Sequence, residues 1–287
     1  WFQTSVPSTH TPAFDIADGT RFAIPGDLPR LWNQADNLPD HYMIIGAGKT
    51  AMDTGVWLLE AGVQPEKIGW VRPRDSWMFN RKLLQPGKHR IEGLIEFQLA
   101  LVEEAATSNS GDEMFAKLDQ RGTMLRIDPE VTPKMFHFAV ISETEVEMLR
   151  QISEVYRQGR VTAIGPDAMH FADETVAVPD NTLFIDCTAS AVPFENRLNT
   201  RPFFADDVIT IQLAQSPFVV YSAALVAFIE ANFDNDMEKN ALCPPAPLTD
   251  TTDTYPYAVM ANLMSTAILS ANDKVNAFNA RSRLHPT

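Results

Sequence analysis

The chain has 287 residues, of which 45% are hydrophobic and 21% are charged, so it has the composition of a globular protein with a buried core. Its formal net charge of −14 disfavours a nucleic-acid-binding surface, and two distant cysteines, Cys187 and Cys243, exclude a disulfide scaffold or a zinc ribbon. The longest uncharged apolar stretch, residues 217–229, is shorter than the roughly 20 residues that a transmembrane helix requires. We therefore expect a cytoplasmic protein with no nucleic-acid partner and no transmembrane segment.

The first part of the chain contains short strand candidates and does not resemble a self-contained domain. Residues 14–16 form one candidate, and Asp18-Gly19 predicts a turn from which residues 21–24 return as a second strand. We predict that residues 1–37 form a connecting β segment.

A strand, a glycine turn, a helix and a second strand come next. Residues 41–45 form an apolar run that stops at Gly46, which is typical of a buried parallel strand. Residues 50–61 have apolar side chains at helical spacing, and residues 68–71 form the next apolar run. This succession predicts a βαβ unit with a right-handed crossover, and therefore an α/β fold with a parallel sheet.

The turn after the first strand matches a dinucleotide-binding pattern. It comprises six consecutive residues: Gly46, Ala47, Gly48, Lys49, Thr50 and Ala51. In such a turn the first glycine makes the bend, the second lets the backbone approach a pyrophosphate, and the third small residue lets the helix pack on the strand. The N–H groups at the helix N-terminus then face the phosphates. Because the turn lies between a strand and a helix, we predict that these six residues bind the cofactor.

Two other interpretations of the turn remain open. Gly48-Lys49-Thr50 has the ending of a P-loop, with residues 183–186 as the metal-binding strand of a nucleoside triphosphatase. A P-loop requires a glycine five residues before Gly48, however, and that position is Met43, inside the predicted strand. The second alternative is a structural glycine turn that binds nothing.

The end of the second strand carries the signal that separates NAD from NADP. NAD-specific sites place an acid there to accept hydrogen bonds from the ribose, whereas this chain has Arg72, Pro73 and Arg74. A guanidinium suits a 2′-phosphate, because its planar fork matches the phosphate oxygens. Against a single acid, Asp75, the segment holds six cations: Arg72, Arg74, Arg81, Lys82, Lys88 and Arg90. We predict that Arg72 and Arg74 bind NADP(H); the alternative is a basic surface that pairs with the acids of the chain.

The remaining sequence gives no catalytic residue. The six histidines show no metal-ligand spacing, and no nucleophile motif such as G-x-S-x-G is present. Ser142 and Glu145 form a capping box that opens a helix to about residue 156, and short strand candidates follow, the last at residues 183–185. We therefore predict no metal, leave the catalytic residues unassigned, and expect a bound cofactor to supply the chemistry for a small-molecule substrate.

The motif from Gly46 to Asp53 resembles the second dinucleotide motif of flavin-containing monooxygenase-like proteins, GxGxSAxD, with Thr50 in place of the serine. The stretch from Gly46 to Arg81, including residues 70–75, is similar to that of FAD/NAD(P)-binding oxidoreductases of the pyridine nucleotide-disulfide oxidoreductase-like class. Residues 157–161, followed by residues 183–189, resemble the point at which the NADP domain of such proteins returns to the FAD domain, although the turn at residues 187–189 lacks the glycine of the family.

The resemblance implies a Rossmann-type parallel sheet with helices on both faces, plus parts of a second, FAD-type α/β domain. Residues 38–190 would be the NADP-binding domain, and residues 1–37 and 191–287 would belong to the FAD-type domain. The implied activity is that of an NADPH-dependent flavoprotein oxidoreductase with FAD, extending to monooxygenation of a small substrate. Because such proteins carry an earlier glycine motif for FAD, we expect this chain to be a fragment. A reductase without oxygen chemistry and a nucleotide-sensing module without catalysis remain alternatives, and a homodimer is compatible with these features.

Overall fold

The computed structural model describes residues 9–33, 37–85, 91–190, 199–216 and 218–285. The chain divides into two compact units, each formed from segments that are far apart in sequence. The sheet unit comprises Gln3–Lys82 and Met124–Ala191, and the helical unit comprises Trp1–Phe2, Leu83–Thr123 and Val192–Thr287. The predicted dinucleotide motif lies in the sheet unit.

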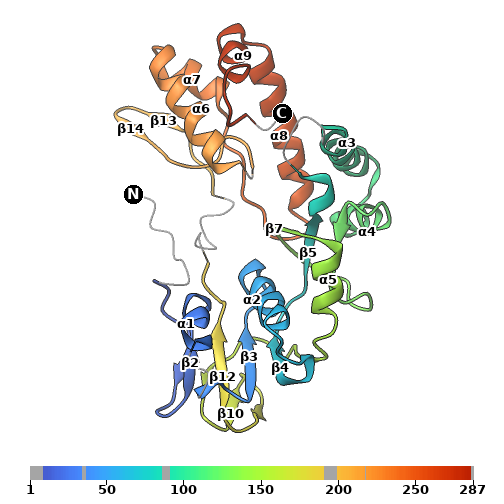
Figure 1. The fold of residues 1–287 in the computed structure, drawn as a ribbon. Helices are drawn as coiled ribbons and strands as arrows, with labels where there is room; N and C mark the ends of the chain where they lie inside the picture. The colour runs from blue at the N-terminus through green and yellow to red at the C-terminus, as the bar shows by residue number, and fades with distance from the viewer. Residues whose placement is uncertain (1–8, 34–36, 86–90, 191–198, 217, 286–287) are drawn as a thin grey trace. The chain divides into compact units, whose positions relative to one another are not determined.

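The centre of the sheet unit is a five-stranded sheet in which every neighbouring pair is parallel (Figure 1). Its strand order is β2 (Arg21–Ala23), β12 (Thr182–Asp186), β3 (His41–Ile45), β4 (Ile68–Val71) and β8 (Glu154–Tyr156). Helix α2 (Lys49–Glu60) connects β3 to the adjacent β4, which confirms the predicted βαβ unit and the α/β fold class. Because all five strands run in the same direction, their carboxyl ends share one edge of the sheet, to which we refer as the carboxyl edge.

Helices cover one face of this sheet. They are α1 (Leu28–Trp32), α2 and α5 (Glu143–Leu149). Successive residues of a strand point to opposite faces, and Ile44 of β3 and Trp70 of β4 both point to the helices and are fully buried. They share one core with Met52 of α2 and Leu149 of α5. Gly55 of α2 permits this packing, because a Cβ atom there would lie only 2.8 Å from the Leu149 side chain.

Strands cover the opposite face. They form a second sheet in the order β1 (Asp15–Ile16), β9 (Ala163–Ile164), β10 (Ala168–His170) and β11 (Thr175–Ala177). Met43 and Phe184 of the parallel sheet pack against Ile164 and Met169 of this second sheet. This corrects the expectation of helices on both faces. The apolar runs between residues 163 and 177 are short and separated by turns, so they pair as antiparallel strands and bury one side of the resulting sheet.

A third, smaller sheet completes the unit. Its strands lie in the order β6 (Met124–Leu125), β5 (Ser76–Asn80) and β7 (Met135–Ile141). The pairing register of β7 with β5 shifts between Trp77 and Phe79, and Phe138 of β7 has a φ of 56°, as expected at a β-bulge. Met78 and Ile141 join the core beneath α2 and α5, so this sheet helps to hold α5 against α2.

The compact units differ from the predicted domain boundaries. β2 comes from the segment 1–37, yet it pairs with β12 in the parallel sheet, so this strand lies in the sheet unit. Helices α3 (Ile91–Thr107) and α4 (Gly111–Gln120) fall inside the predicted domain 38–190, yet they belong to the helical unit, where α3 contacts α8 (Tyr255–Ser270). The assignment of a FAD-type domain stays a prediction.

Short connecting elements are the 3-10 helices η1 (Pro25–Asp27), η3 (Pro65–Lys67) and η4 (Arg81–Leu83).

The helical unit consists of helices and one short hairpin. Its elements are α3 (Ile91–Thr107), α4 (Gly111–Gln120), β13 (Phe204–Ala205), β14 (Val208–Ile209), α6 (Val219–Asn232), α7 (Asp236–Leu242), α8 (Tyr255–Ser270) and α9 (Asp273–Asn279). Phe203 and Tyr221 lie in its core, and the side chains of Ser110, Asn235 and Asn272 cap α4, α7 and α9. Within the described part of the chain, no helix combines the length and apolarity needed to cross a membrane.

Candidate functional site

The glycine turn begins at Gly46, at the carboxyl edge between β4 and β12. Its N–H donates to the carbonyl oxygen of Val71 at 3.0 Å, and its own carbonyl oxygen accepts from Nε1 of Trp70 at 2.7 Å. Gly46 has a φ of 132°, and a Cβ atom there would lie 2.6 Å from the carbonyl oxygen of Cys187. Only glycine satisfies both conditions. Gly46 therefore makes the bend and allows the close approach of β12.

Gly48 has different surroundings, although it belongs to the same turn. It is the N-cap of α2 in an extended conformation with a φ of −88°, and no side chain caps the helix there. A Cβ atom at Gly48 would meet no heavy atom within 4 Å. Ala51 is fully buried, whereas Ala47, Lys49 and Thr50 are half-buried. Because the first N–H groups of a helix have no intrahelical partners, this arrangement leaves donors and open space for an anion beside Gly48.

The charge of Lys49 is compensated within the protein. Lys49 forms an ion pair with Asp53 one turn later in α2, and its Nζ lies 3.9 Å from Oε1 of Glu145 in α5. Nη1 of Arg81 lies 2.6 Å from the other oxygen of the same carboxylate. Burial acts to raise the pKa of Glu145, but hydrogen bonds from Ser142 and Arg81 outweigh it and lower the pKa. Lys49 therefore also connects α2 with the N-terminus of α5.

Arg72 directly follows β4, and it is buried. Its side chain is 4% exposed, and its guanidinium lies over the ring of Trp70, 4.9 Å from the ring centroid. Nη2 lies 3.1 Å from Oδ1 of Asp75, whereas Nε and Nη1 are buried without a hydrogen-bond partner. Burial lowers the pKa of Arg72, and the charge of Asp75 acts in the opposite direction. Two buried donors are costly when they are unpaired, so Arg72 has unused capacity to bind an acceptor.

Asp75 connects Arg72 with a second arginine, Arg157, which directly follows β8. Nε of Arg157 donates to Oδ2 of Asp75 at 2.9 Å, and Nη2 donates to Oδ2 of Asp128 at 2.8 Å. Hydrogen bonding to Asp75 raises the pKa of Arg157, and a backbone hydrogen bond from Glu130, together with Arg157, lowers the pKa of Asp128. We refer to Arg72, Asp75, Asp128 and Arg157 as the arginine–aspartate cluster. Its two positive and two negative formal charges cancel.

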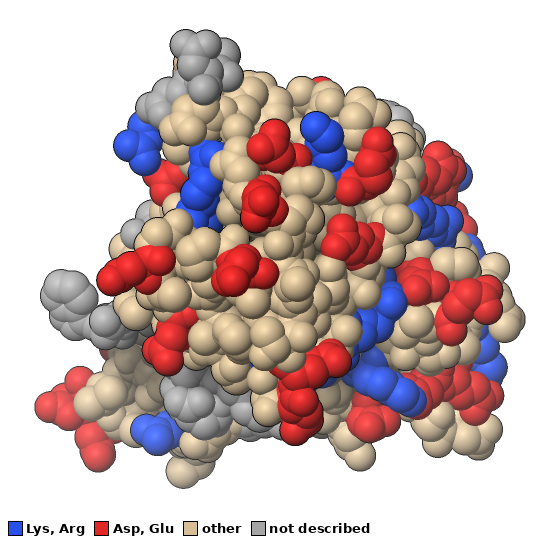
Figure 2. All heavy atoms as spheres, turned by 90° about the horizontal axis from the view of Figure 1, so that it is seen from below, with Lys and Arg blue, Asp and Glu red and all other residues tan. Residues whose placement is uncertain are grey.

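The described members of the basic cluster predicted from the sequence have different environments, and Arg72 is the buried one. Arg74 is exposed, and Arg81 pairs with α5 as described above. Lys88 and Arg90 lie outside the described residues. Figure 2 shows one face of the molecule, on which acidic and basic side chains are intermixed. The structure therefore places Arg72 at the carboxyl edge as a buried group, whereas Arg74 is exposed and Arg81 pairs with Glu145.

A histidine–threonine–aspartate cluster lies at the carboxyl end of β12. Asp186 is buried and accepts hydrogen bonds from the N–H and the hydroxyl of Thr188, at 2.9 and 2.6 Å. Since an ionised carboxylate only accepts, the Thr188 hydroxyl donates to it and accepts from Nε2 of His10, 3.0 Å away. Nε2 of His10 also lies 3.8 Å from Oδ2 of Asp186. Burial raises the pKa of the neighbouring Cys187 thiol to about 12, so Cys187 is not a thiolate at neutral pH.

These groups occupy successive positions along the carboxyl edge. From β12 to β8, the strands end in Asp186, the glycine turn, Arg72 and Arg157. In a doubly wound sheet a dinucleotide lies across this edge, with its pyrophosphate at the helix N-terminus and its adenosine ribose at the end of the following strand. The loop between β3 and α2 contains only residues 46–48, which is shorter than the loop that wraps a triphosphate in a P-loop protein.

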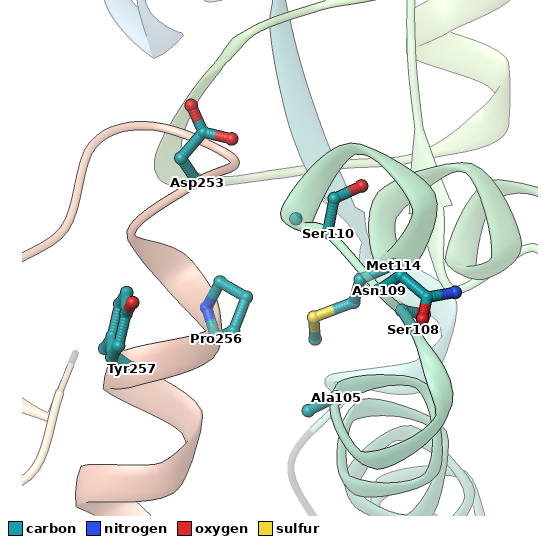
Figure 3. A pocket seen from close by; sticks show the side chains of 9 residues that line it. Ala105, Ser108, Asn109, Ser110, Met114, Asp253, Pro256 and Tyr257 are labelled. Atoms are coloured by element: carbon teal, nitrogen blue, oxygen red, sulfur yellow. The ribbon is translucent and has the colours of Figure 1, made fainter.

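Two small cavities lie in the helical unit, and neither is lined by the glycine turn. The larger has a volume of about 190 Å³ and lies between Pro256 and Tyr257 of α8 and Met114 of α4 (Figure 3). The other has a volume of about 160 Å³ and lies beside Lys239 and the β13–β14 hairpin. Both are smaller than the roughly 300 Å³ at which ligand pockets usually begin. Of the residues that the structure describes, no group of three or more His, Cys, Asp or Glu side chains is placed to hold a metal ion.

Along the carboxyl edge, the sequence singles out the glycine turn and Arg72 but not the groups that surround them. Asp75 was counted only as the acid among the cations, and Arg157, 82 residues later, was not considered as its partner. His10 and Asp186 were not identified either. The sequence signal that could have identified Arg157 and Asp186 is their position at the ends of strands. The parallel sheet places these strands, β8 and β12, beside β4 and β3.

No protein-family model matches the chain. Uncharacterized proteins of Mycobacterium bovis and Mycobacterium tuberculosis are 36% identical to it over 250 residues. The match covers 87% of this chain and 45% of each relative, so the chain spans about half the length of the curated relatives it matches. The structure is distantly similar to L-lysine 6-monooxygenase from Pseudomonas syringae, with a TM-score of 0.31 and 13% identity over 88% of this chain and 59% of that chain. At this TM-score the similarity does not define the site, which is defined by the strand order and the turn.

Proposed function

We propose that the sheet unit binds NADP(H), with the pyrophosphate at residues 46–51 and the adenosine ribose at the end of β4. The observation that carries this proposal is the open space beside Gly48, at the uncapped N-terminus of the helix that follows the central strand. There the backbone can approach a pyrophosphate closely, and the helix dipole favours its negative charge. Arg72 directly follows β4, where NAD-specific sites have an acid, and this favours NADP(H).

For the intact protein we infer an NADPH-dependent flavoprotein oxidoreductase, with monooxygenation of a small substrate as the finer form of that activity. The support is the resemblance of residues 46–53 to the motif of flavin-containing monooxygenase-like proteins. Over the ranges that the structure describes, the strand–turn–helix after β3 is the one glycine turn of this type, so FAD has no assigned residues here. Because the chain spans about half the length of its relatives, the activity and substrate of the whole protein belong to the proposal.

The residues of this chain would act by binding and orienting the nucleotide. NADPH supplies a hydride when it is bound, and the protein fixes where the reacting end lies. With the pyrophosphate on the turn and the adenosine end at β4, the nicotinamide end extends toward the carboxyl end of β12. His10, Thr188 and Asp186 lie there, and hydrogen bonds between these side chains hold them in place.

Titration of NADPH into the wild type and Gly48→Val, followed by nucleotide fluorescence, tests the site. The extended backbone of Gly48 accepts a valine, but the added methyl groups would fill the space next to the pyrophosphate. We expect NADPH to bind at least about tenfold more weakly, which corresponds to about 1.4 kcal/mol. Gly26→Val is the matched control, because a Cβ atom at Gly26 also meets nothing within 4 Å.

Unchanged NADPH affinity in a folded Gly48→Val protein would contradict the site. Binding of Mg-ATP in place of NADPH would favour the nucleoside triphosphatase alternative. In the intact protein, NADPH oxidation with transfer of one oxygen atom of O2 to a product separates a monooxygenase from a simple reductase, in which consumed oxygen leaves as hydrogen peroxide. Binding without any NADPH oxidation would favour a nucleotide-sensing module.

A further inference from the structure

The arginine–aspartate cluster lies where the adenosine ribose of a dinucleotide would lie in the proposed site, so the inference drawn from it rests on the proposed function. Arg72 directly follows β4, Asp75 comes three residues later, and Arg157 directly follows β8. The backbone N–H of Arg72 donates to the carbonyl oxygen of Tyr156 at 2.8 Å, which joins the two strand ends. The cluster is therefore anchored in the sheet itself.

Asp75 lies between the two guanidinium groups. Its Oδ1 is 3.1 Å from Nη2 of Arg72, and its Oδ2 is 2.9 Å from Nε of Arg157. A carboxylate held by two arginines offers the same acceptor pattern as a phosphate group, which arginine binds with the same planar fork. Asp75 is 9% exposed, so its interaction with a second anion nearby would be screened only partly by water. The protein thus contains an internal anion where a 2′-phosphate would bind.

The three arginines at this end of the sheet differ in how accessible and how well oriented they are. Arg72 is buried, and its side chain is held against Trp70. Arg74 is exposed, and no contact in the described structure fixes its side chain. Arg157 has a 35% exposed side chain and is oriented by Asp75 and by Asp128, while its Nη1 takes part in none of these hydrogen bonds. A donor that is already oriented loses less conformational freedom when it binds a ligand, which favours Arg157 over Arg74.

We propose that Arg157 distinguishes NADPH from NADH, and that Asp75 competes with the 2′-phosphate for its guanidinium. On binding, the phosphate takes donors of Arg157, and Asp75 keeps its pair with Arg72. Arg72 is then a positioning residue, because its stacking on Trp70 and its ion pair fix the Asp75 carboxylate. NADH has no 2′-phosphate, so its affinity depends on neither Arg157 nor the charge of Asp75.

The nucleotides 2′,5′-ADP and 5′-ADP test this proposal, because they differ only in the 2′-phosphate. Calorimetric titration should show that Arg157→Ala lowers the affinity for 2′,5′-ADP by about tenfold or more. The affinity for 5′-ADP should change by less than about twofold. Arg157→Lys should restore part of the loss, since it keeps the charge but not the fork. Asp75→Asn should raise the affinity for 2′,5′-ADP by about threefold or more, because it removes a negative charge that repels the 2′-phosphate. Arg160→Ala is the matched control: Arg160 is an exposed arginine three residues further on, and both affinities should stay unchanged.

The proposal would be overturned if Arg74→Ala, and not Arg157→Ala, selectively lost affinity for 2′,5′-ADP. Equal losses of affinity for both nucleotides in Arg157→Ala would also overturn it. Weaker binding of 2′,5′-ADP to a folded Asp75→Asn protein would overturn it as well. Thermal unfolding identifies any variant that does not fold, and if Arg157→Ala is one of them, Arg157→Lys and Asp75→Asn decide. Equal affinity of the wild type for both nucleotides overturns the inference and the preference for NADP(H) over NAD(H) but leaves a dinucleotide site at the glycine turn, whereas binding of neither nucleotide contradicts that site as well.

Discussion

Replacing each of the two turn glycines by alanine separates a structural role from a binding role. At Gly46, with a φ of 132°, an L-residue costs about 1–3 kcal/mol of backbone strain. The added Cβ atom would also lie 2.6 Å from the carbonyl oxygen of Cys187, and overpacking of this kind costs about 1–3 kcal/mol. Because the clash is with the backbone after β12, a side-chain rotation cannot relieve it. Gly46→Ala should therefore lower the free energy of unfolding by about 2–6 kcal/mol.

Gly48→Ala should leave stability almost unchanged. Its φ of −88° is allowed for alanine, and the new methyl group meets no heavy atom within 4 Å. Alanine reduces the entropy of the unfolded chain, which stabilises by about 0.4–1 kcal/mol. It is also a poorer N-cap than glycine, by about 0.5 kcal/mol or more, so the two effects largely cancel. The methyl group would, however, occupy space on the side of the pyrophosphate and weaken NADPH binding.

Thermal unfolding of both variants and the wild type, followed by circular dichroism, measures the difference. Each kcal/mol corresponds to roughly 2–4 °C in Tm for a chain of this size, so Gly46→Ala should lose at least roughly 4 °C relative to Gly48→Ala. NADPH titration of the same samples then separates the two roles. If Gly46→Ala is as stable as Gly48→Ala, the close approach of β12 to the turn is not what requires a glycine at residue 46.

Two further predictions concern the groups that hold the turn and α5. Trp70→Phe removes the indole N–H that donates to Gly46, leaves a buried acceptor unpaired, and should lower the free energy of unfolding by about 2–4 kcal/mol in urea titrations. The control Trp57→Phe, which alters another ring packed against the same core, should cost less, and equal losses would contradict the role of the indole hydrogen bond. Because the pKa of Glu145 is lowered in the folded protein, its charged form stabilises the fold at neutral pH. This stabilisation is lost as the pH falls below 4.5, the ordinary pKa of the carboxyl group, and then through the lower pKa of the folded state. The stability difference between wild type and Glu145→Gln in urea should therefore shrink from pH 7 to about pH 3, and a constant difference would refute this account.

The βαβ unit could be predicted because its signals are local. The apolar runs at residues 41–45 and 68–71 coincide with β3 and β4, and α2 begins one residue before the predicted start. Each element has its own periodicity, and Gly46 interrupts the first run at the point where the chain must turn. The predicted capping box of Ser142 with Glu145 is likewise present, since it depends on residues three apart.

The pairing of distant segments could not be predicted in the same way. β2 and β12 are separated by most of the sheet unit, and no local pattern shows that they are neighbours. The helix expected to run from residue 143 to about residue 156 ends at Leu149, and residues 154–156 form β8 because they pair with β4. Helix propensity is a weak preference, and sheet pairing overrode it there.

The identity of Arg72 was visible in the sequence, but its burial was not. Its stacking on Trp70 follows from strand alternation, since residues two apart lie on the same face. Its pairing with Asp75, and through it with Arg157, depends on the distance between the ends of β4 and β8. The sequence therefore indicates that a cation lies at the end of β4, whereas only the structure shows which of the nearby cations is accessible.

The charges along the carboxyl edge also favour one direction for a bound dinucleotide. The buried carboxylate of Asp186 lies on the β12 side of the glycine turn, and Arg72 and Arg157 lie on the other side. A reversed dinucleotide would place the 2′-phosphate, with about two negative charges, near Asp186 and away from both guanidinium groups. Like charges repel strongly where burial limits screening, so that orientation is disfavoured even though the pyrophosphate could still contact the helix N-terminus. In the proposed function, the turn thus sets where the nucleotide binds, and the unequal charges of the strand ends set which end of it reaches β12.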